Sequence, residues 1–151
     1  MTLQAWTTAG WLREHDTQLG EIQHLWSVAS ADLAEAAQPQ YTPALRFEYA
    51  YNAALKACII ALYAERRRPG QVADVHHKLI RSLPLTLGPV RGVAADYLDA
   101  CRERRDRLGR EDGDATIVTS DDAGALLEFA RSLHDDVRTW MRERHPELAV
   151  E

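Results

Sequence analysis

The chain has 151 residues, of which 27% are charged, and a formal net charge of −5. That length suits one globular domain. The acidic balance excludes a protein that coats nucleic acid in general, although it leaves room for one local basic patch. The two cysteines, Cys58 and Cys101, lie in apolar helical stretches without Cys-x-x-Cys spacing. We therefore expect buried reduced thiols, no metal site and no other cofactor.

The sequence shows no targeting or membrane signal. Its first residues, MTLQAWTTAG, lack the basic start and apolar run of a signal peptide. No stretch approaches the ~20 apolar residues that a membrane span needs. We therefore expect a cytoplasmic protein with no membrane association.

The N-terminal part of the chain is predicted to be an arm followed by a helix. Residues 1–16 carry Trp6 and Trp11 without a long periodic pattern, and we expect a short helical turn or arm that lays these tryptophans on the body. Apolar residues then recur at steps of three and four, which predicts a helix over 17–38 that Thr17 caps and that ends before a proline.

A second helix is predicted over 42–67, and it should be the central one. Proline suits its first turn, and the chain is apolar around nearly the whole axis from residue 45 to residue 64. Its polar exceptions Glu48, Asn52 and Lys56 are four residues apart and form one line along the helix surface. This line is either the partner of an arginine from another helix or a hydrogen-bonded or ion-paired stripe at the helix surface.

A short helix is predicted over 72–83, and it carries two adjacent histidines. His76 and His77 point about 100° apart on a helix, so they cannot chelate one metal ion from the same face. Each is either a core or capping histidine or a proton-transfer group for a neighbouring site.

The most unusual stretch is YLDACRERRDRLGRED, residues 97–112, in a helix predicted over 89–110. Its apolar stripe continues past Cys101 to an inward slot at Arg104 or Arg105, one turn before Leu108. A guanidinium that faces a helix seam needs a carboxylate or another acceptor nearby. From residue 102 to residue 110, five arginines against Glu103 and Asp106 give a charge of +3, from Arg102, Arg104, Arg105, Arg107 and Arg110. The alternative is a solvated basic helix end, which the helix dipole favours.

A last helix is predicted over 120–144, where carboxylates follow a capping residue and apolar residues step by three and four. The predicted fold is therefore all-α, an antiparallel four- to five-helix bundle. We expect one helical domain over 17–146, between the arm at 1–16 and a tail at 147–151.

The run YAYNAALKAC at 49–58, the His76-His77 pair and residues 102–112 together resemble a HEPN domain, in particular its small stand-alone actinobacterial members. The resemblance covers about residues 17–144. It implies an antiparallel helical bundle that dimerises. It also implies a metal-independent ribonuclease, often a toxin whose antitoxin is a minimal nucleotidyltransferase.

The family signature is an arginine, a polar residue and then a histidine, and this chain departs from it. Arg105 matches the arginine and Asp106 the polar residue, but the histidine slot falls on residues 110–112, which are Arg, Glu and Asp. Arginine stays protonated and can stabilise phosphate charge, but it does not transfer protons near neutrality. The missing imidazole would have to come from His76 or His77 on another helix or on a partner subunit.

Three functional hypotheses follow. The favoured one is a catalytically degenerate dimeric module that binds a nucleotide, RNA or a partner protein at an arginine-lined cleft. The second is an active ribonuclease of the toxin–antitoxin type, with Arg105, Asp106 and His77 as catalytic candidates. The third is a structural or regulatory dimer whose arginines pair with carboxylates. Binding is expected to involve Arg102, Arg105, Arg107 and Arg110, with Glu48, Asn52 and Lys56 in support.

Overall fold

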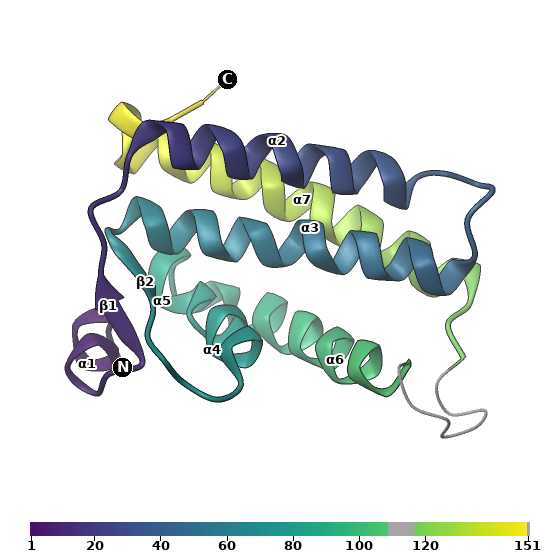
Figure 1. Ribbon diagram of the computed structural model, residues 1–151, viewed down its shortest axis with the longest axis horizontal. Helices are drawn as coiled ribbons and strands as arrows, with labels where there is room; N and C mark the ends of the chain where they lie inside the picture. Colours follow the sequence, from purple (N-terminus) through teal and green to yellow (C-terminus); the bar gives the residue numbers. More distant parts are fainter. Residues whose placement is uncertain (109–116, 151) are drawn as a thin grey trace.

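The computed structural model describes residues 1–108 and 117–150, and the described chain is mostly helical (Figure 1). The all-α prediction is confirmed. The helices are α1 Leu3–Thr8, α2 Leu19–Ala36, α3 Pro43–Ala64, α4 Val75–Arg81, α5 Leu83–Leu87, α6 Gly92–Leu108 and α7 Ser120–Arg144, with 3₁₀ turns at Pro89–Arg91 and Pro146–Leu148. Strands β1 (Leu12–Glu14) and β2 (Arg67–Pro69) pair antiparallel in a two-stranded ribbon.

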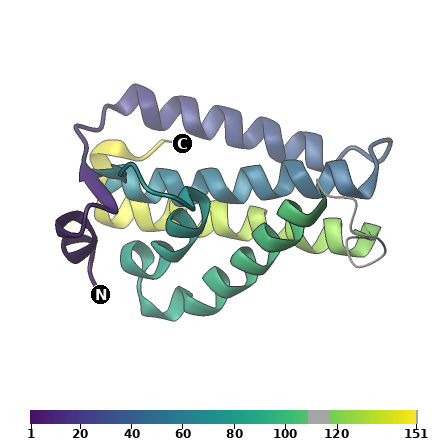
Figure 2. The ribbon, with the colours of Figure 1, turned by 60° about the horizontal axis from the view of Figure 1, so that its bottom comes forward.

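Helix α3 is the centre of the molecule, as its apolar circumference predicted. It packs mainly against α2 and α7, and α6 and α4 contact its remaining side. Figure 2 shows α6 crossing the α3–α7 pair obliquely. The α3 side chains with 0–1% exposure are mostly small: Ala50, Tyr51, Ala53, Ala54, Ala57, Cys58, Ile60, Ala61, Leu62 and Ala64. Both cysteines are buried and free.

The long helices begin and end close to the predicted residues. Helix α7 has the predicted bounds because Thr119 accepts a hydrogen bond from the Asp122 backbone nitrogen at its start. Thr17 is not the cap of α2. Its hydroxyl donates to the Tyr63 carbonyl at 2.6 Å, and the Glu21 carboxylate instead accepts from the Gln18 backbone nitrogen at the start of that helix.

The β ribbon was not predicted, whereas α1 is the short helical turn expected near the N-terminus. Helix α3 ends at Ala64, three residues earlier than predicted, because Arg66 adopts a left-handed conformation (φ 59°) that turns the chain into β2. The segment 1–16 supplies β1 and places Trp6 and Leu12 in the core.

The two remaining helix predictions also need adjustment. The helix predicted over 72–83 is α4 alone, and α5 follows it as a separate turn after Ser82. The helix predicted over 89–110 opens with a 3₁₀ turn, and its last two residues lie outside the described ones. In the predicted tail, Leu148 is buried.

Glycine is required at position 70, where the ribbon meets the end of α1. A Cβ there would clash with the backbone oxygen of Gly10. Because that oxygen belongs to the backbone, it cannot move aside as the end of a flexible side chain could. We expect Gly70→Ala to lower the free energy of unfolding by about 1–3 kcal/mol. Gly124→Ala in α7 has open space around its Cβ and should raise it by about 0.5–1 kcal/mol. Urea denaturation of both variants tests this, and equal effects would contradict it.

His134 on α7 should make the fold sensitive to acid. Its side chain is buried, Nε2 lies 2.7 Å from the Ala53 carbonyl oxygen, and Nδ1 has no partner among the described residues. Burial lowers the pKa of His134, so below pH ~6.5 the unfolded chain binds a proton that the folded chain excludes. Stability should therefore fall with pH by up to about 1.4 kcal/mol per unit below that value, and less steeply in His134→Gln. Parallel pH dependences in the two proteins would contradict this.

Candidate functional site

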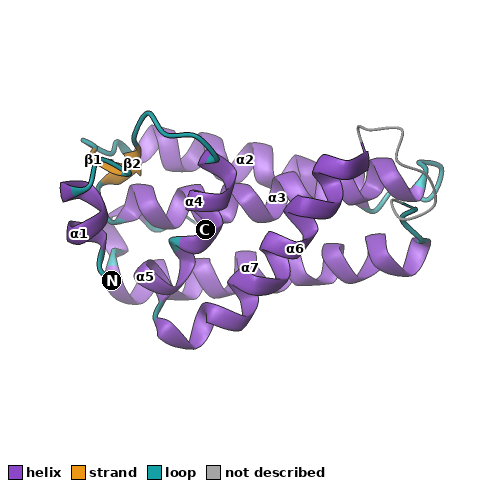
Figure 3. Cartoon of the chain, turned by 90° about the horizontal axis from the view of Figure 1, so that it is seen from below, coloured by secondary structure: helices purple, strands orange, loops and turns teal. Residues whose placement is uncertain are grey.

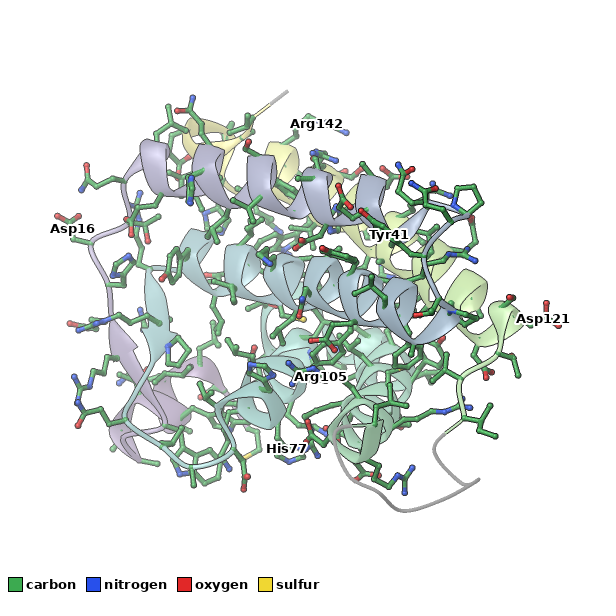
Figure 4. The ribbon with its side chains drawn as sticks, turned by 45° about the vertical axis from the view of Figure 1, so that its right-hand side comes forward. Asp16, Tyr41, His77, Arg105, Asp121 and Arg142 are labelled. Carbon is green, nitrogen blue, oxygen red and sulfur yellow. The ribbon has the colours of Figure 1, made fainter. Side chains whose placement is uncertain are left out.

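The candidate site lies where α3, α4 and the C-terminal half of α6 meet. Figure 4 shows Arg105 and His77 on this side of α3. The buried stripe of α6, with Ala95, Leu98 and Cys101, packs the helix on the body. The same turns therefore bring the arginines that follow against α3 and α4.

Arg105 occupies the inward slot that the α6 pattern predicted, and its partner is Glu48 of the polar stripe on α3. Its Nε lies 3.1 and 2.9 Å from the two carboxylate oxygens, and Nη2 lies 3.0 Å from Oε1. The guanidinium also lies over the ring of Tyr51, 5.2 Å from its centroid. Hydrogen bonding to Glu48 raises the pKa of Arg105, so this cation is fixed in place and permanently charged.

The other end of the polar stripe on α3 contacts α2. Lys56 pairs with Asp32 of α2 at 2.6 Å, and Asn52 between them is half-buried. The stripe therefore divides between two helices, and Glu48 alone of its three residues is ion-paired with Arg105.

A second cluster forms around Asp99, whose carboxylate is nearly buried. It accepts hydrogen bonds from Arg102 Nε at 2.8 Å and Arg81 Nη2 at 3.4 Å, and it lies 3.0 Å from His77 Nδ1. Arg102 also donates to Asp106 at 3.2 Å. Burial opposes ionisation of Asp99, but the bonds from Arg102 and His77 outweigh it and leave its pKa below the usual value. His77 is thus held by a structural carboxylate.

His76 lies closer to the environment of Arg105. Its Nδ1 is 3.1 Å from the hydroxyl of Tyr51, the residue on which Arg105 stacks. Burial and then the positive charges of Arg105 and Arg102 lower the pKa of His76, so the imidazole is neutral at pH 7. Burial raises the pKa of Tyr51, which keeps its hydroxyl protonated and able to donate or accept. In the tautomer with the hydrogen on Nδ1, Nε2 of His76 can accept a proton, and in the other tautomer it donates a hydrogen bond.

An open groove borders Arg105 between the start of α3 and the end of α6. Its lining residues are Ala44, Leu45, Glu48, Arg105, Asp106 and Leu108. Asp106 thus accompanies Arg105, as predicted, whereas Arg107 is exposed and does not line the groove, and Arg110 lies outside the described residues. Arg104 turns away to the start of α7, where it donates to Asp122 at 2.9 Å and to the carbonyl of Ile117, which precedes that helix.

Three arginines of this segment are neutralised within the fold. Each of Arg102, Arg104 and Arg105 has a carboxylate partner, and the partners include residues of α3 and α7 as well as of α6 itself. The charge of +3 counted over residues 102–110 therefore overstates the positive electrostatic field at this face. Sequence reasoning did not select Tyr51, Asp99 or Arg81. Tyr51 and Asp99 carried a usable signal, the i, i+3 spacing to Glu48 and to Arg102, whereas nothing in the sequence connects Arg81 with Asp99.

Comparisons with protein-family models, with curated proteins and with solved structures give no match. None of the helices described is long and apolar enough to cross a membrane. Within residues 1–108 and 117–150, no three side chains among His, Cys, Asp and Glu are grouped so that they could hold a metal ion.

Proposed function

We propose that the chain is a HEPN-like helical module that acts as a homodimer and binds single-stranded RNA through Arg105 and Arg102. The observation that carries this proposal is the position of Arg105 beside an open groove, with donors to spare. Glu48 occupies Nε and Nη2, whereas Nη1 lies 3.5 Å from Asp106, longer than a good hydrogen bond. A guanidinium fixed in this way is preorganised for a phosphate oxygen.

The carboxylates around Arg105 set the strength of the proposed binding. A phosphate that approaches Nη1 experiences repulsion from Glu48 and Asp106, because all these groups are anionic. Binding should therefore be weak, which agrees with the acidic net charge of the chain, and it should fall with salt according to the number of phosphates that the arginines contact.

Substitution of Arg105 and substitution of Glu48 should change the affinity for RNA in opposite directions. We expect Arg105→Ala to weaken binding of a fluorescent single-stranded RNA roughly tenfold or more at low salt, because a charged hydrogen bond is lost. Glu48→Gln should strengthen binding, because the competing negative charge is gone. Fluorescence anisotropy at 50 and 200 mM KCl measures both effects.

The control for this experiment is Glu128→Gln, which makes the same charge change at an exposed ion pair on α7. Thermal melts establish that each variant is folded, and light scattering tests the dimer. No binding by the unaltered protein at low salt would contradict the proposal and favour a structural or regulatory dimer. The ion pairs of Arg102, Arg104 and Arg105 with carboxylates already favour such a structural or regulatory dimer.

A second candidate function, RNA cleavage, is favoured by His76. In this reaction the 2′-hydroxyl oxygen bonds to phosphorus and the bond to the 5′-oxygen breaks, which leaves a 2′,3′-cyclic phosphate and a 5′-hydroxyl. A neutral imidazole near Arg105 can take the proton from the 2′-hydroxyl, and the imidazolium formed in this way can give a proton to the leaving 5′-oxygen, while the guanidinium stabilises the phosphate charge. The nucleotidyltransferase-type antitoxin would be a partner under this candidate alone.

Substitution of the two histidines separates cleavage from binding. Under the second candidate, His76→Asn lowers cleavage by about 10²-fold or more, whereas His77→Asn, which loses its contact with Asp99, has a smaller effect. If His76 is the base, cleavage should persist below pH 6.5 because the pKa of His76 is lowered. If the unaltered protein leaves the RNA intact, the cleavage candidate is excluded and binding without turnover remains.

A further inference from the structure

The β ribbon places two arginines directly opposite each other. In the register of the ribbon, Arg13 of β1 pairs with Arg68 of β2. Both side chains are exposed, and in the described part of the chain neither has a carboxylate within ion-pair distance or a side-chain hydrogen bond. Like charges at directly opposite positions repel, so this pair costs stability rather than adding it.

The neighbouring arginines of the ribbon have structural partners, which makes the exposed pair distinct. Arg66 donates to the Thr17 carbonyl at 2.8 Å, and Arg67 donates to the Thr7 hydroxyl at 3.0 Å and to backbone carbonyls. Of the three consecutive arginines 66–68, two therefore hold the N-terminal segment, whereas Arg68 is available to a ligand.

A third cation lies on the same face of the ribbon. The Gly70 nitrogen donates to the Trp11 carbonyl at 2.9 Å, which continues the strand pairing by one step. Because side chains alternate along a strand, Trp11 projects from the face that carries Arg13 and Arg68. The Lys78 ammonium of α4 lies 3.7 Å from the centre of the Trp11 ring. Glu14, the acidic residue of β1, belongs to the opposite face.

We propose that this face, formed by Arg13, Arg68 and Lys78, is a second contact site for the phosphates of single-stranded RNA. Two adjacent guanidiniums without carboxylate partners can share phosphate oxygens, and a bound phosphate removes the repulsion between them. In Figures 1 and 3, α4 lies between the ribbon and the C-terminal half of α6. One strand of RNA would thus follow α4 from the ribbon to Arg105.

The choice of RNA rests on the proposed function, but the residues of the ribbon can be tested separately. The double variant Arg13→Gln/Arg68→Gln is compared with Arg131→Gln/Arg142→Gln, which removes two exposed arginines of α7 and the same net charge. A fluorescent 12-nucleotide uridine RNA is titrated with the full chain between 50 and 200 mM KCl.

We expect the ribbon variant to bind roughly tenfold more weakly at 50 mM KCl, and its salt slope to fall by about 1.4, which corresponds to two phosphate contacts. The α7 variant should change affinity less than about twofold, because its charges act only at long range. The ribbon variant should melt at or above the temperature of the unaltered protein, because a repulsion is removed.

Equal weakening by the two double variants, or none by the ribbon variant, would overturn the inference. So would a lower melting temperature of the ribbon variant, which would assign the pair a structural role. Binding to phosphatidylserine vesicles without binding to RNA would also overturn it. If Arg105→Ala abolishes binding and the ribbon variant does not weaken it, the proposed function stands and this inference fails. The reverse pattern supports the ribbon site and removes Arg105 from the function.

Discussion

The enclosure of α3 by other helices is the constraint on which the rest of the structure depends. Its many alanines let α2 and α7 approach closely, and almost no surface of its middle turns remains for water. Each polar group along α3 must therefore be satisfied by a neighbour, because an unpaired buried group is costly. Glu48 is satisfied by Arg105, Lys56 by Asp32, and the Ala53 carbonyl lies against His134.

The features predicted correctly from the sequence are those in which a periodic pattern spans several turns. The capped, regularly stepped α7 and the inward slot of α6 are examples, because hydrophobic periodicity alone determines them. The β ribbon has no such signal, since its three-residue strands, Leu-Arg-Glu and Arg-Arg-Pro, are too short to show an alternation of apolar residues. The contact of His77 with Asp99 depends on how α4 lies against α6, and no local rule specifies that arrangement.

Two groups of arginines that composition cannot distinguish have opposite surroundings in this fold. Arg102, Arg104 and Arg105 of α6 meet carboxylates from three helices and contribute little net field, whereas Arg13 and Arg68 lie opposite each other without such partners among the described residues. Ion pairs at half-exposed positions add little stability, so the first group mainly fixes how α6 is oriented on α3 and α4. The second group contributes nothing to that orientation, and a phosphate bound as proposed would offset the repulsion within it.

The β ribbon also bears on the order in which the chain folds. Its strands are more than fifty residues apart in sequence, yet α2 and α3 between them form an antiparallel helical hairpin, and Thr17 contacts Tyr63 at the base of that hairpin. Once the hairpin has docked, residues 14 and 67 are already neighbours, and pairing the strands requires almost no further loop closure. The ribbon thus continues the α2–α3 hairpin, with paired strands in place of paired helices. It should form late in folding and open first, taking α1 and Trp6 with it.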